Sequence, residues 1–228
     1  MNYLYTMVLK IIETADGSSS IYNEALDETY HSRHGAIQEA QHVFLQMGLH
    51  RFSERKELDI LEMGFGTGLN TWLTLLEQAE SRQTIRYCGV EAYPLKEEEY
   101  MAMNYVEQLQ HPKGKELFER MHAAEWEEET EISKGFFLEK HESFFKDLDY
   151  DDQFDLIYFD AFGPRVQPEL WTEEIFRIMF KALRPGGLLT TYSSKGDARR
   201  AMIASGFRVE KHPGPPGKRE MLIAFKDE

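Results

Sequence analysis

A glycine-rich segment between two predicted elements carries the clearest chemical signal in the sequence. Residues 62–68 read Glu-Met-Gly-Phe-Gly-Thr-Gly, with an apolar strand predicted over Leu58–Met63 and a helix over Leu69–Ala79. Glycines let the backbone pass close to a ligand, and the first turn of a helix offers free N–H groups. We therefore expect a ligand site here rather than a tight turn alone. Its expected residues are Glu62, Gly64, Phe65, Gly66, Thr67, Gly68 and Asn70.

Three kinds of ligand loop compete for this segment, and the spacing of its residues separates them. A phosphate-binding P-loop ends in Gly-Lys-Ser or Gly-Lys-Thr, and the sequence has no such ending here. A dinucleotide fingerprint places its third glycine or an alanine one position later, where Leu69 stands. The spacing acid-x-Gly-x-Gly-x-Gly instead resembles the first motif of class I S-adenosylmethionine (AdoMet) methyltransferases. That resemblance implies that the loop passes under the amino-acid part of AdoMet.

Polar residues follow the next two predicted strands. Glu91 ends the strand Ile85–Val90, about 20 residues beyond the loop, where Rossmann-like sheets place a carboxylate on ribose hydroxyls. The third strand, Phe136–Leu138, is followed by His141 and Glu142. Many class I enzymes have an aspartate there that reads adenine, and this sequence lacks it. We expect His141 or Glu142 to take its place.

A further acid, Asp160, follows the strongly apolar segment Phe154–Phe159. The carboxyl ends of parallel strands meet at one edge of a sheet, so Asp160 should face the same crevice as Gly64 and Glu91. A role as a helix N-cap is disfavoured because the next helix is expected to begin only near Thr172. We expect Asp160 to be the catalytic residue.

The apolar pattern predicts strands and helices in alternation, which is typical of a doubly wound α/β sheet covered on both faces. Residues 1–50 are expected to form a small N-terminal extension, a hairpin and a helix, packed on a class I methyltransferase domain over residues 51–228. The last two strands lack a helix between them and should pair antiparallel at one edge. The extension consists of strands Met7–Ile12 and Ser20–Tyr22 and a helix over Gly35–Gly48; the other expected elements are helices over Leu95–Leu109, Trp171–Leu183 and Ala198–Ala204, strands over Leu188–Tyr192, Phe207–Glu210 and Met221–Phe225, and a loop or helix end over Glu125–Glu131.

Charge is distributed unevenly along the 228 residues. The net charge is −14, which by itself argues against a nucleic-acid partner. Between Ile178 and Arg219, however, nine Lys and Arg residues stand against two acids, a local charge of +7 that leaves −21 for the rest. Phosphates respond mainly to the local field. This segment is therefore either a solvated basic surface or a face for RNA.

The sequence gives no sign of a membrane span, a disulfide framework or a metal centre. No apolar run approaches the roughly 18 residues of a membrane helix, and the apolar N-terminus lacks the basic leader of a signal peptide. Cys88 is the single cysteine. Tyr30, His31 and His34 lack a third metal ligand at a convincing spacing. We expect a cytoplasmic protein without a bound metal.

Several segments together resemble the methyltransferase module of the MnmC/MnmD family, which acts on the wobble uridine of certain tRNAs. Arg-Pro-Gly-Gly (184–187) is common to many methyltransferases, whereas Asp-Ala-Phe-Gly-Pro together with Lys-Arg-Glu-Met is quite specific. The resemblance covers nearly the whole chain. The other matching segments are Gly-Phe-Gly-Thr-Gly-Leu-Asn (64–70), Phe-Asp-Ala-Phe-Gly-Pro (159–164), Pro-Glu-Leu-Trp (168–171), Gly-Lys-Arg-Glu-Met (217–221), and His-Ser-Arg-His-Gly-Ala (31–36) with Glu39 and His-Val-Phe-Leu (42–45).

This resemblance implies methyl transfer from AdoMet to the exocyclic amine of 5-aminomethyl-(2-thio)uridine, giving the 5-methylaminomethyl form. Bifunctional members carry a second, FAD-dependent module that first removes a carboxymethyl group. Because this sequence ends at Glu228, we expect that module to be missing and a separate enzyme to supply the aminomethyl uridine. The tRNA anticodon region would meet the basic C-terminal face. The residues expected at the substrate are Tyr30, His31, Phe162, Pro164, Lys218 and Arg219, the last two as phosphate contacts.

Two other functions remain compatible with the sequence. A polyamine aminopropyltransferase shares this fold and an acidic pocket, and it predicts acids in the substrate cleft without RNA binding. A non-catalytic nucleotide-binding module predicts ligand binding without turnover. Among single residues, Tyr30 and His31 could equally cap the first long helix, and Phe162 could equally belong to the core.

Calorimetry distinguishes AdoMet from a dinucleotide. We predict that AdoMet or its demethylated product binds and that NAD does not, because Leu69 stands where a dinucleotide loop needs glycine or alanine. Glu91→Ala should weaken AdoMet binding by about 1.5–3 kcal/mol, the usual contribution of a hydrogen bond to a charged group. Tight binding of NAD would contradict the assignment.

Overall fold

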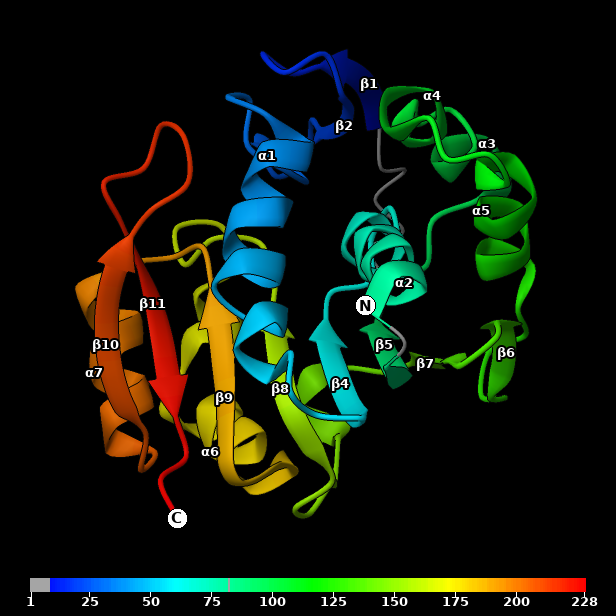
Figure 1. Cartoon of the computed structure of the whole chain (residues 1–228). Coiled ribbons are helices and arrows are strands. Elements are labelled where there is room, and N and C mark those ends of the chain that lie inside the picture. The colour runs from blue at the N-terminus through cyan, green and yellow to red at the C-terminus, as the bar shows by residue number, and fades with distance from the viewer. Residues whose placement is uncertain (1–8, 82) are drawn as a thin grey trace.

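The computed structural model describes residues 9–81 and 83–228, and within them eight strands form one sheet. Their order across the sheet is β10-β11-β9-β8-β4-β5-β7-β6 (Figure 1). The five central strands β9, β8, β4, β5 and β7 run parallel, whereas β11 pairs antiparallel with both β9 and β10. The doubly wound prediction with an antiparallel pair at one edge is confirmed. The strand bounds are β4 Glu57–Met63, β5 Thr84–Glu91, β6 Thr130–Ser133, β7 Phe136–Glu142, β8 Phe154–Phe159, β9 Leu183–Thr191, β10 Arg208–Pro213 and β11 Glu220–Phe225.

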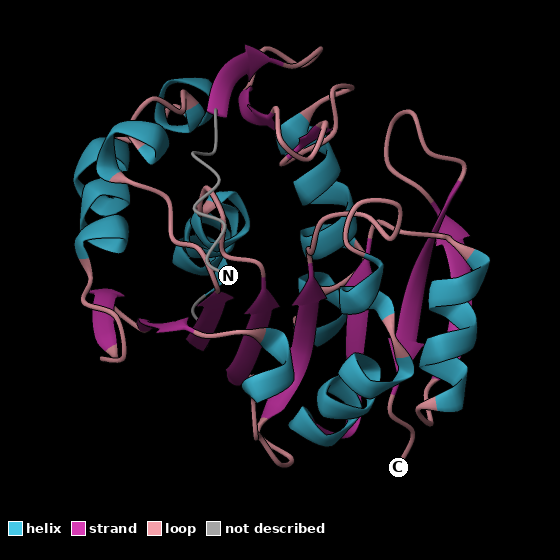
Figure 2. Ribbon diagram, turned by 180° about the vertical axis from the view of Figure 1, so that it is seen from behind, coloured by secondary structure: helices cyan, strands magenta, loops and turns pink. Residues whose placement is uncertain are grey.

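Helices cover both faces of this sheet, as Figures 1 and 2 show from opposite sides. On one face lie α1 (Ala36–Ala40), which continues as a π-helical segment over Gln41–Gln46, and α2 (Leu69–Ser81), with α5 (Gly114–Ala123) beyond it. On the other face lie α6 (Glu173–Ala182) and α7 (Gly196–Ala204). Each face therefore has its own cluster of buried apolar side chains.

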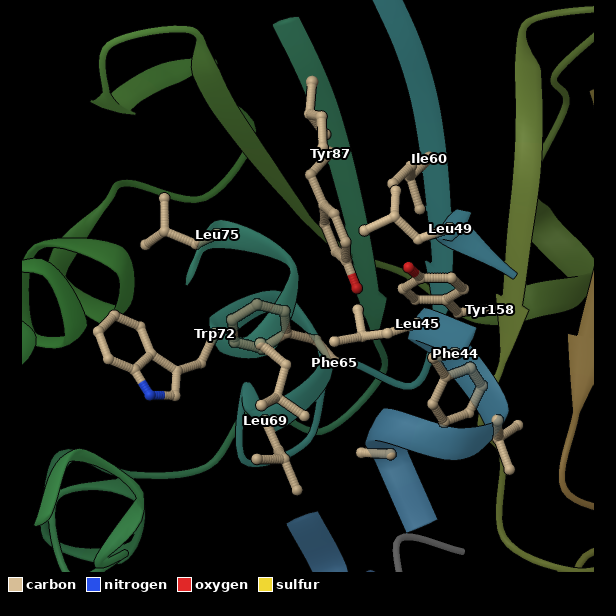
Figure 3. Close-up of a cluster of buried hydrophobic side chains, with 14 of the residues drawn as sticks. Phe44, Leu45, Leu49, Ile60, Phe65, Leu69, Trp72, Leu75, Tyr87 and Tyr158 are labelled. Carbon is tan, nitrogen blue, oxygen red and sulfur yellow. The ribbon is translucent and has the colours of Figure 1, made fainter. Parts of the chain in front are cut away.

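Aromatic side chains fill the larger of the two clusters (Figure 3). The ring of Phe44 in the π-helical segment packs 5.0 Å from that of Tyr158 in β8, centroid to centroid, and Tyr158 lies 6.1 Å from Tyr87 in β5. Helix α2 adds Leu69 and Trp72 from the apolar face that the sequence predicted. Burial of these large side chains holds α1 and α2 against the sheet, and thus fixes the residues at its carboxyl edge.

The N-terminal hairpin forms as predicted in the described residues, where β1 (Leu9–Glu13) pairs antiparallel with β2 (Ser19–Asn23), and β3 (Glu28–Thr29) adds a third short strand. The predicted residues 7 and 8 lie outside the described residues. The following helix packs directly on the sheet, since the Thr190 hydroxyl donates to the carbonyl of Val43 (2.8 Å). The boundary at residue 50 between an extension and a methyltransferase domain stays a prediction.

The single helix expected over Leu95–Leu109 is wrong. Two short helices, α3 (Glu97–Tyr100) and α4 (Tyr105–Leu109), replace it, with a break that ends at Asn104. The Asn104 carboxamide accepts a hydrogen bond from the Ser19 N–H (2.7 Å) and donates one to the carbonyl of Gly17 (2.9 Å). Contacts with the distant hairpin thus compete with the helical pattern, and local periodicity does not reveal them.

Other differences from the expected elements are smaller. Helix α6 ends at Ala182, and the segment Arg-Pro-Gly-Gly lies within β9 as an irregularity: Phe154 of β8 pairs with Leu183, but Leu156 pairs with Leu188. Helix α5 and strand β6 were not predicted. Strands β7 and β10 extend by four and three residues beyond their expected ends.

Candidate active site

The glycine loop leaves β4 at the carboxyl edge of the sheet and crosses the end of β5. The N–H groups of Gly64 and Phe65 both donate to the carbonyl of Val90, each at 3.0 Å. Gly64 has φ +98°, and a Cβ atom there would lie 2.8 Å from the backbone oxygen of Asp160. Only glycine fits this conformation and this close approach. The predicted turn therefore brings the ends of β4, β5 and β8 together.

One carboxamide joins the two buried acids of this edge. The Asn70 Nδ2 atom, in the first turn of α2, donates to Glu62 Oε1 (2.9 Å) and to Asp160 Oδ2 (2.8 Å). The hydroxyl of Thr71 donates to the other Glu62 oxygen (2.9 Å). Glu62 is completely buried, and Asp160 is partly buried. Residues from β4, α2 and the end of β8 thus form a single polar cluster.

Burial makes both carboxyl groups weaker acids than usual. It raises the pKa of Glu62 to about 8, against the hydrogen bond from Asn70, while the nearby Asp160 adds to the rise. It raises the pKa of Asp160 to about 7, where the Asn70 hydrogen bond and Lys218 oppose the rise and Glu39 adds to it. Carboxyl groups that titrate near neutral pH are typical of functional sites.

The cluster offers features that fit a cationic amino-acid ligand such as the methionine part of AdoMet. The Asn70 Oδ1 atom is buried and accepts no hydrogen bond from any described residue. It lies on the side chain that holds two acids, at the start of the helix that follows the glycine loop. An unsatisfied buried acceptor next to carboxylates is costly unless a donor from a ligand reaches it.

Glu91 fastens the glycine loop to the end of β5. Its two oxygens accept the N–H groups of Gly66 and Tyr93, each at 3.0 Å. Burial raises the pKa of Glu91, and these backbone hydrogen bonds oppose the rise. Each carboxylate oxygen can accept a further bond. Glu91 can therefore receive ribose hydroxyls, as the sequence predicts, while it also holds the loop.

Tyr30 and Phe162, two of the expected substrate residues, meet over the glycine loop. Their rings are 5.0 Å apart in an edge-to-face arrangement, and the Tyr30 ring lies against Gly66. The Phe162 carbonyl accepts a hydrogen bond from the Trp171 indole (2.8 Å), which fixes the loop that also holds the partly exposed Pro164. The aromatic pair forms one wall beside the cluster.

His31 lies further inside, with its ring edge-to-face to that of Tyr105 at 6.4 Å. Burial lowers the pKa of His31 to about 4, so the imidazole is neutral at pH 7. Phe65 and Thr67 also turn inward. The Phe65 ring packs against His122 and Trp126, and the Thr67 hydroxyl bonds to Tyr105 (3.0 Å). Both side chains therefore pack against neighbouring side chains of the protein.

His141 and Glu142 interact with other acids at the end of β7. The His141 ring lies between Glu127 (2.5 Å) and Glu139 (3.2 Å), and the N–H of Glu142 donates to Glu127 (2.9 Å). The Glu142 side chain is exposed. An adenine-reading role for either residue stays a prediction, and the partners of His141 weigh against it.

Two aromatic residues that the sequence analysis did not single out flank Glu91 instead. Tyr93 and Phe144 follow the ends of β5 and β7 by two residues each, and are 58% and 48% exposed. Their ring centroids are 5.9 Å apart. Exposed aromatic side chains directly after two parallel strands are the signal that could have identified them.

Tertiary contacts neutralise most of the basic segment 178–219. Six of its nine cations form ion pairs, several with acids from distant parts of the chain. Lys218 turns inward, pairs with Glu39 of α1, and lies partly buried. The other pairs are Lys181 with Asp149, Arg184 with Asp59 and Asp155, Arg200 with Asp197, Arg208 with Glu210 and Asp227, and Lys211 with Glu220.

Three cations of the segment have no acidic partner within 4 Å among the described residues: Lys195, Arg199 and Arg219. Lys195 and Arg199 lie at the start of α7, which follows the carboxyl end of β9, and Arg219 lies in the exposed loop between β10 and β11. Figure 1 shows both places on the side of the sheet toward which the parallel strands point. The free positive charge is therefore smaller than the sequence suggests, but it lies on the side of Asp160.

Over the described ranges, no group of three or more His, Cys, Asp or Glu side chains is arranged to hold a metal ion. None of the helices described is long and apolar enough to cross a membrane.

Comparison with known proteins assigns the family. The profile of the S-adenosyl-L-methionine-dependent methyltransferases matches residues 105–227, which is more than half of the chain. The chain therefore belongs to that family, and AdoMet is its cofactor. The sheet order and the glycine loop described above are those of class I enzymes.

Within this family, the chain is similar to particular tRNA-modifying proteins. The tRNA 5-methylaminomethyl-2-thiouridine biosynthesis bifunctional protein MnmC of Nitrosospira multiformis is 32% identical over 90% of this chain and 35% of its own length, and that of Aromatoleum aromaticum is 30% identical over 91% and 34%. The chain thus spans about a third of the length of these curated relatives. The resemblance to the MnmC/MnmD family is confirmed.

Solved structures agree with the relatives. The crystal structure of MnmC2 from Aquifex aeolicus has a TM-score of 0.79 at 27% identity, over 99% of this chain and 73% of that one. Spermidine synthase from Thermotoga maritima has a TM-score of 0.60 at 15% identity, over 96% and 68%. The second likeness shows the shared fold alone.

The raised pKa of Glu62 predicts how stability depends on pH. Between about pH 4.5 and 8 the folded chain keeps a proton on Glu62 that the unfolded chain releases, so the free energy of unfolding should fall as the pH rises. One such proton contributes about 1.4 kcal/mol per pH unit. Glu62→Gln should reduce this slope in denaturant titrations at pH 5.5 to 8, whereas Glu54→Gln, at an exposed position, should keep the wild-type slope. Equal slopes in both variants would contradict the burial argument.

Proposed function

We propose that this chain methylates the exocyclic amine of 5-aminomethyl-(2-thio)uridine at the tRNA wobble position, with AdoMet as the methyl donor. The observation that carries the proposal is the cluster of Glu62, Asn70 and Asp160 beside the glycine loop. A cluster of acids at the carboxyl edge of the sheet suits a substrate that arrives as an ammonium ion. Relatives named for 5-methylaminomethyl-2-thiouridine biosynthesis match about nine-tenths of the chain, which supports this substrate over a polyamine.

The residues that would hold AdoMet lie along the carboxyl edge of the sheet. The glycine loop and Asn70 Oδ1 would receive the amino-acid part, Glu91 the ribose, and the exposed rings of Tyr93 and Phe144 the adenine. When bound, AdoMet supplies a methyl group made electrophilic by its sulfonium. Loss of Glu91 would weaken binding without touching the acceptor side, whereas loss of Asn70 would also remove a hydrogen bond from Asp160.

Asp160 would act on the acceptor amine. Only the neutral amine has the lone pair that attacks a methyl carbon, and the nitrogen carries positive charge until a proton leaves. A carboxylate beside that nitrogen orients the lone pair, stabilises the developing charge and can accept the proton. A pKa near 7 makes Asp160 a better proton acceptor than an ordinary aspartate. Tyr30, His31, Phe162 and Pro164 would wall the pocket of the modified uridine.

The tRNA would approach from the side of the sheet that presents Lys195, Arg199 and Arg219. These side chains have no acidic partner among the described residues and can therefore bind phosphates without breaking an ion pair. The aminomethyl uridine would have to be present in the tRNA before this step. A tRNA substrate of this kind would place the protein in the cytoplasm.

Methylation of tRNA tests the function, and Asp160→Asn tests the residue. With AdoMet, the wild-type chain should convert aminomethyl uridine in tRNA to methylaminomethyl uridine, measured by nucleoside analysis. Asp160→Asn keeps the shape and removes the charge, so kcat should fall by about 10²–10³-fold with AdoMet binding nearly unchanged. Asp149→Asn, at an exposed position before β8, is the matched control and should retain kcat.

Two outcomes would contradict these assignments. Near-normal turnover in Asp160→Asn would make Asp160 structural. Conversion of carboxymethylaminomethyl uridine by these 228 residues alone would contradict the division of labour that the family implies, in which an FAD-dependent module performs that step. Nucleosides from a deletion strain should show loss of the methylaminomethyl form and accumulation of the aminomethyl form.

The salt dependence of tRNA binding tests the proposed RNA face. Each lost phosphate contact should reduce the log–log slope of affinity against salt by about one unit. We expect this for Arg219→Ala and Arg199→Ala, together with a raised KM for tRNA. Lys181→Ala, whose side chain is paired with Asp149, should leave the slope unchanged. An unchanged slope in all three variants would mean that the basic segment is only a solvated surface.

A further inference from the structure

Lys218 lies in an unusual place for a lysine in a surface loop. Its ammonium group pairs with the carboxylate of Glu39 and lies 3.9 Å from the centroid of the Tyr192 ring. The side chain of Lys218 is only 31% exposed, and that of Glu39 only 9%. Two charges removed this far from water lose hydration that their attraction only partly restores. Such a pair contributes little to the stability of the fold by itself, which points to a functional role.

The pair connects three separate parts of the chain at the candidate reacting centre. Glu39 lies in α1, Lys218 in the loop between β10 and β11, and Tyr192 directly after β9. The Tyr192 hydroxyl donates to the carbonyl of Ala161 (2.8 Å), the residue after Asp160. The ion pair therefore lies one side chain away from the segment that carries the catalytic carboxylate.

The loop that carries Lys218 is held in place at two further points. A Cβ atom on Gly217, which has φ +83°, would overlap the His34 ring, so the backbone passes directly against it. The His42 Nε2 atom lies 2.9 Å from the carbonyl oxygen of Pro213. Glu39 is fixed as well, because its Oε1 atom accepts the N–H of Ser32 (3.0 Å). The inward direction of Lys218 is thus part of a docked arrangement.

We propose that Lys218 and Glu39 are positioning residues that set the charge around the acceptor amine, with Lys218 compensating Glu39 so that Asp160 alone meets the substrate. The proposal rests on the proposed function, since it concerns the same amine. Two uncompensated carboxylates would hold the substrate as an ammonium ion, which has no lone pair to react. A single carboxylate can bind the amine and still allow it to lose a proton.

The groups around Asp160 determine the signs of the expected effects. The titratable groups among them are Glu62 from β4, Glu39 from α1, Lys218 from the β10–β11 loop, Tyr192 after β9 and Tyr105 from α4, and the neutral Asn70 of α2 donates a hydrogen bond to Asp160. Lys218 lowers the pKa of Asp160 and Glu39 raises it. Loss of Lys218 alone should therefore raise this pKa, and loss of the Glu39 charge alone should lower it.

The experiment combines a titration with a kinetic pH profile in five variants. Asp160 is followed by ¹³C NMR of carboxyl-labelled aspartate, its signal assigned by its absence in Asp160→Asn, and kcat for tRNA methylation is measured from pH 6 to 9. In Lys218→Met, both midpoints should move up by about one pH unit, with kcat near pH 6.5 up to about tenfold lower. In Glu39→Gln the Asp160 midpoint should move down.

Two comparisons separate this role from others. The double variant Glu39→Gln/Lys218→Met removes both charges and should return the midpoints toward the wild-type values. Arg219→Ala, the neighbouring cation, should raise the KM for tRNA and leave both midpoints in place. Lys218→Arg keeps the charge and should keep the wild-type midpoint. If Lys218→Met fails to fold, the double variant and Lys218→Arg still test the proposal.

Specific results overturn the proposal. Unshifted midpoints in Lys218→Met, with a raised KM and a reduced salt slope like those of Arg219→Ala, would make Lys218 a phosphate contact, as the sequence suggested. A double variant no better than Lys218→Met would exclude compensation. A wild-type chain that leaves tRNA unmethylated would overturn the proposed function itself and the acceptor role of the pair with it, so the two failures are distinct.

Discussion

The Asn70 carboxamide links the parts of the site, because among the described residues its side chain is the one that donates hydrogen bonds to both Glu62 and Asp160. Two carboxyl groups at the end of adjacent parallel strands would repel each other if both were ionised. The shared donor on α2 and the raised pKa values of both acids allow them to remain close together. The glycine loop has to place the start of α2 where Asn70 reaches both acids, so the positions of the turn, the helix and the acids depend on each other.

The same dependence extends to the two ends of the chain. The segment after the N-terminal hairpin supplies Tyr30 and Glu39, and the last hairpin of the sheet supplies Lys218. Both segments reach the carboxyl edge of the sheet, and the strands that form this edge come from the middle of the sequence. The site is consequently completed by residues about 180 positions apart, and it is assembled only when the sheet is fully formed. A polar cluster of this kind is expected to lose its pKa shifts on local unfolding, since burial causes them.

Ion pairs also reduce the free positive charge on the surface of this acidic protein. Most cations of the basic segment are bound to acids, and the three without an acidic partner in the described part of the chain are grouped at the start of α7 and in the β10–β11 loop. A weak but localised positive field beside a cluster of acids is a reasonable arrangement for a substrate with both phosphates and an amine. The phosphates would meet the cations, and the amine would meet the acids.

By itself, the sequence determined the family, the doubly wound sheet and the position of its glycine loop. These follow from signals that are local in the chain: apolar runs of strand length, glycines at fixed spacing, and acids directly after strands. Glu62, Gly64, Asn70, Glu91 and Asp160 were all identified in this way, because parallel strands bring their carboxyl ends to one edge whatever else the chain does.

Tertiary structure alone decided which side chains meet across long separations. The break before Asn104 depends on the hairpin around Gly17, and the inward turn of Lys218 depends on Glu39. His141 is paired with Glu127 and Glu139, and neither of these residues belongs to the glycine loop. Periodicity and composition depend on the residues near each position in the sequence. An ion pair or a hydrogen bond depends on where a distant partner is placed. That placement is a property of the packed core, in which side chains from the whole chain compete for the same space.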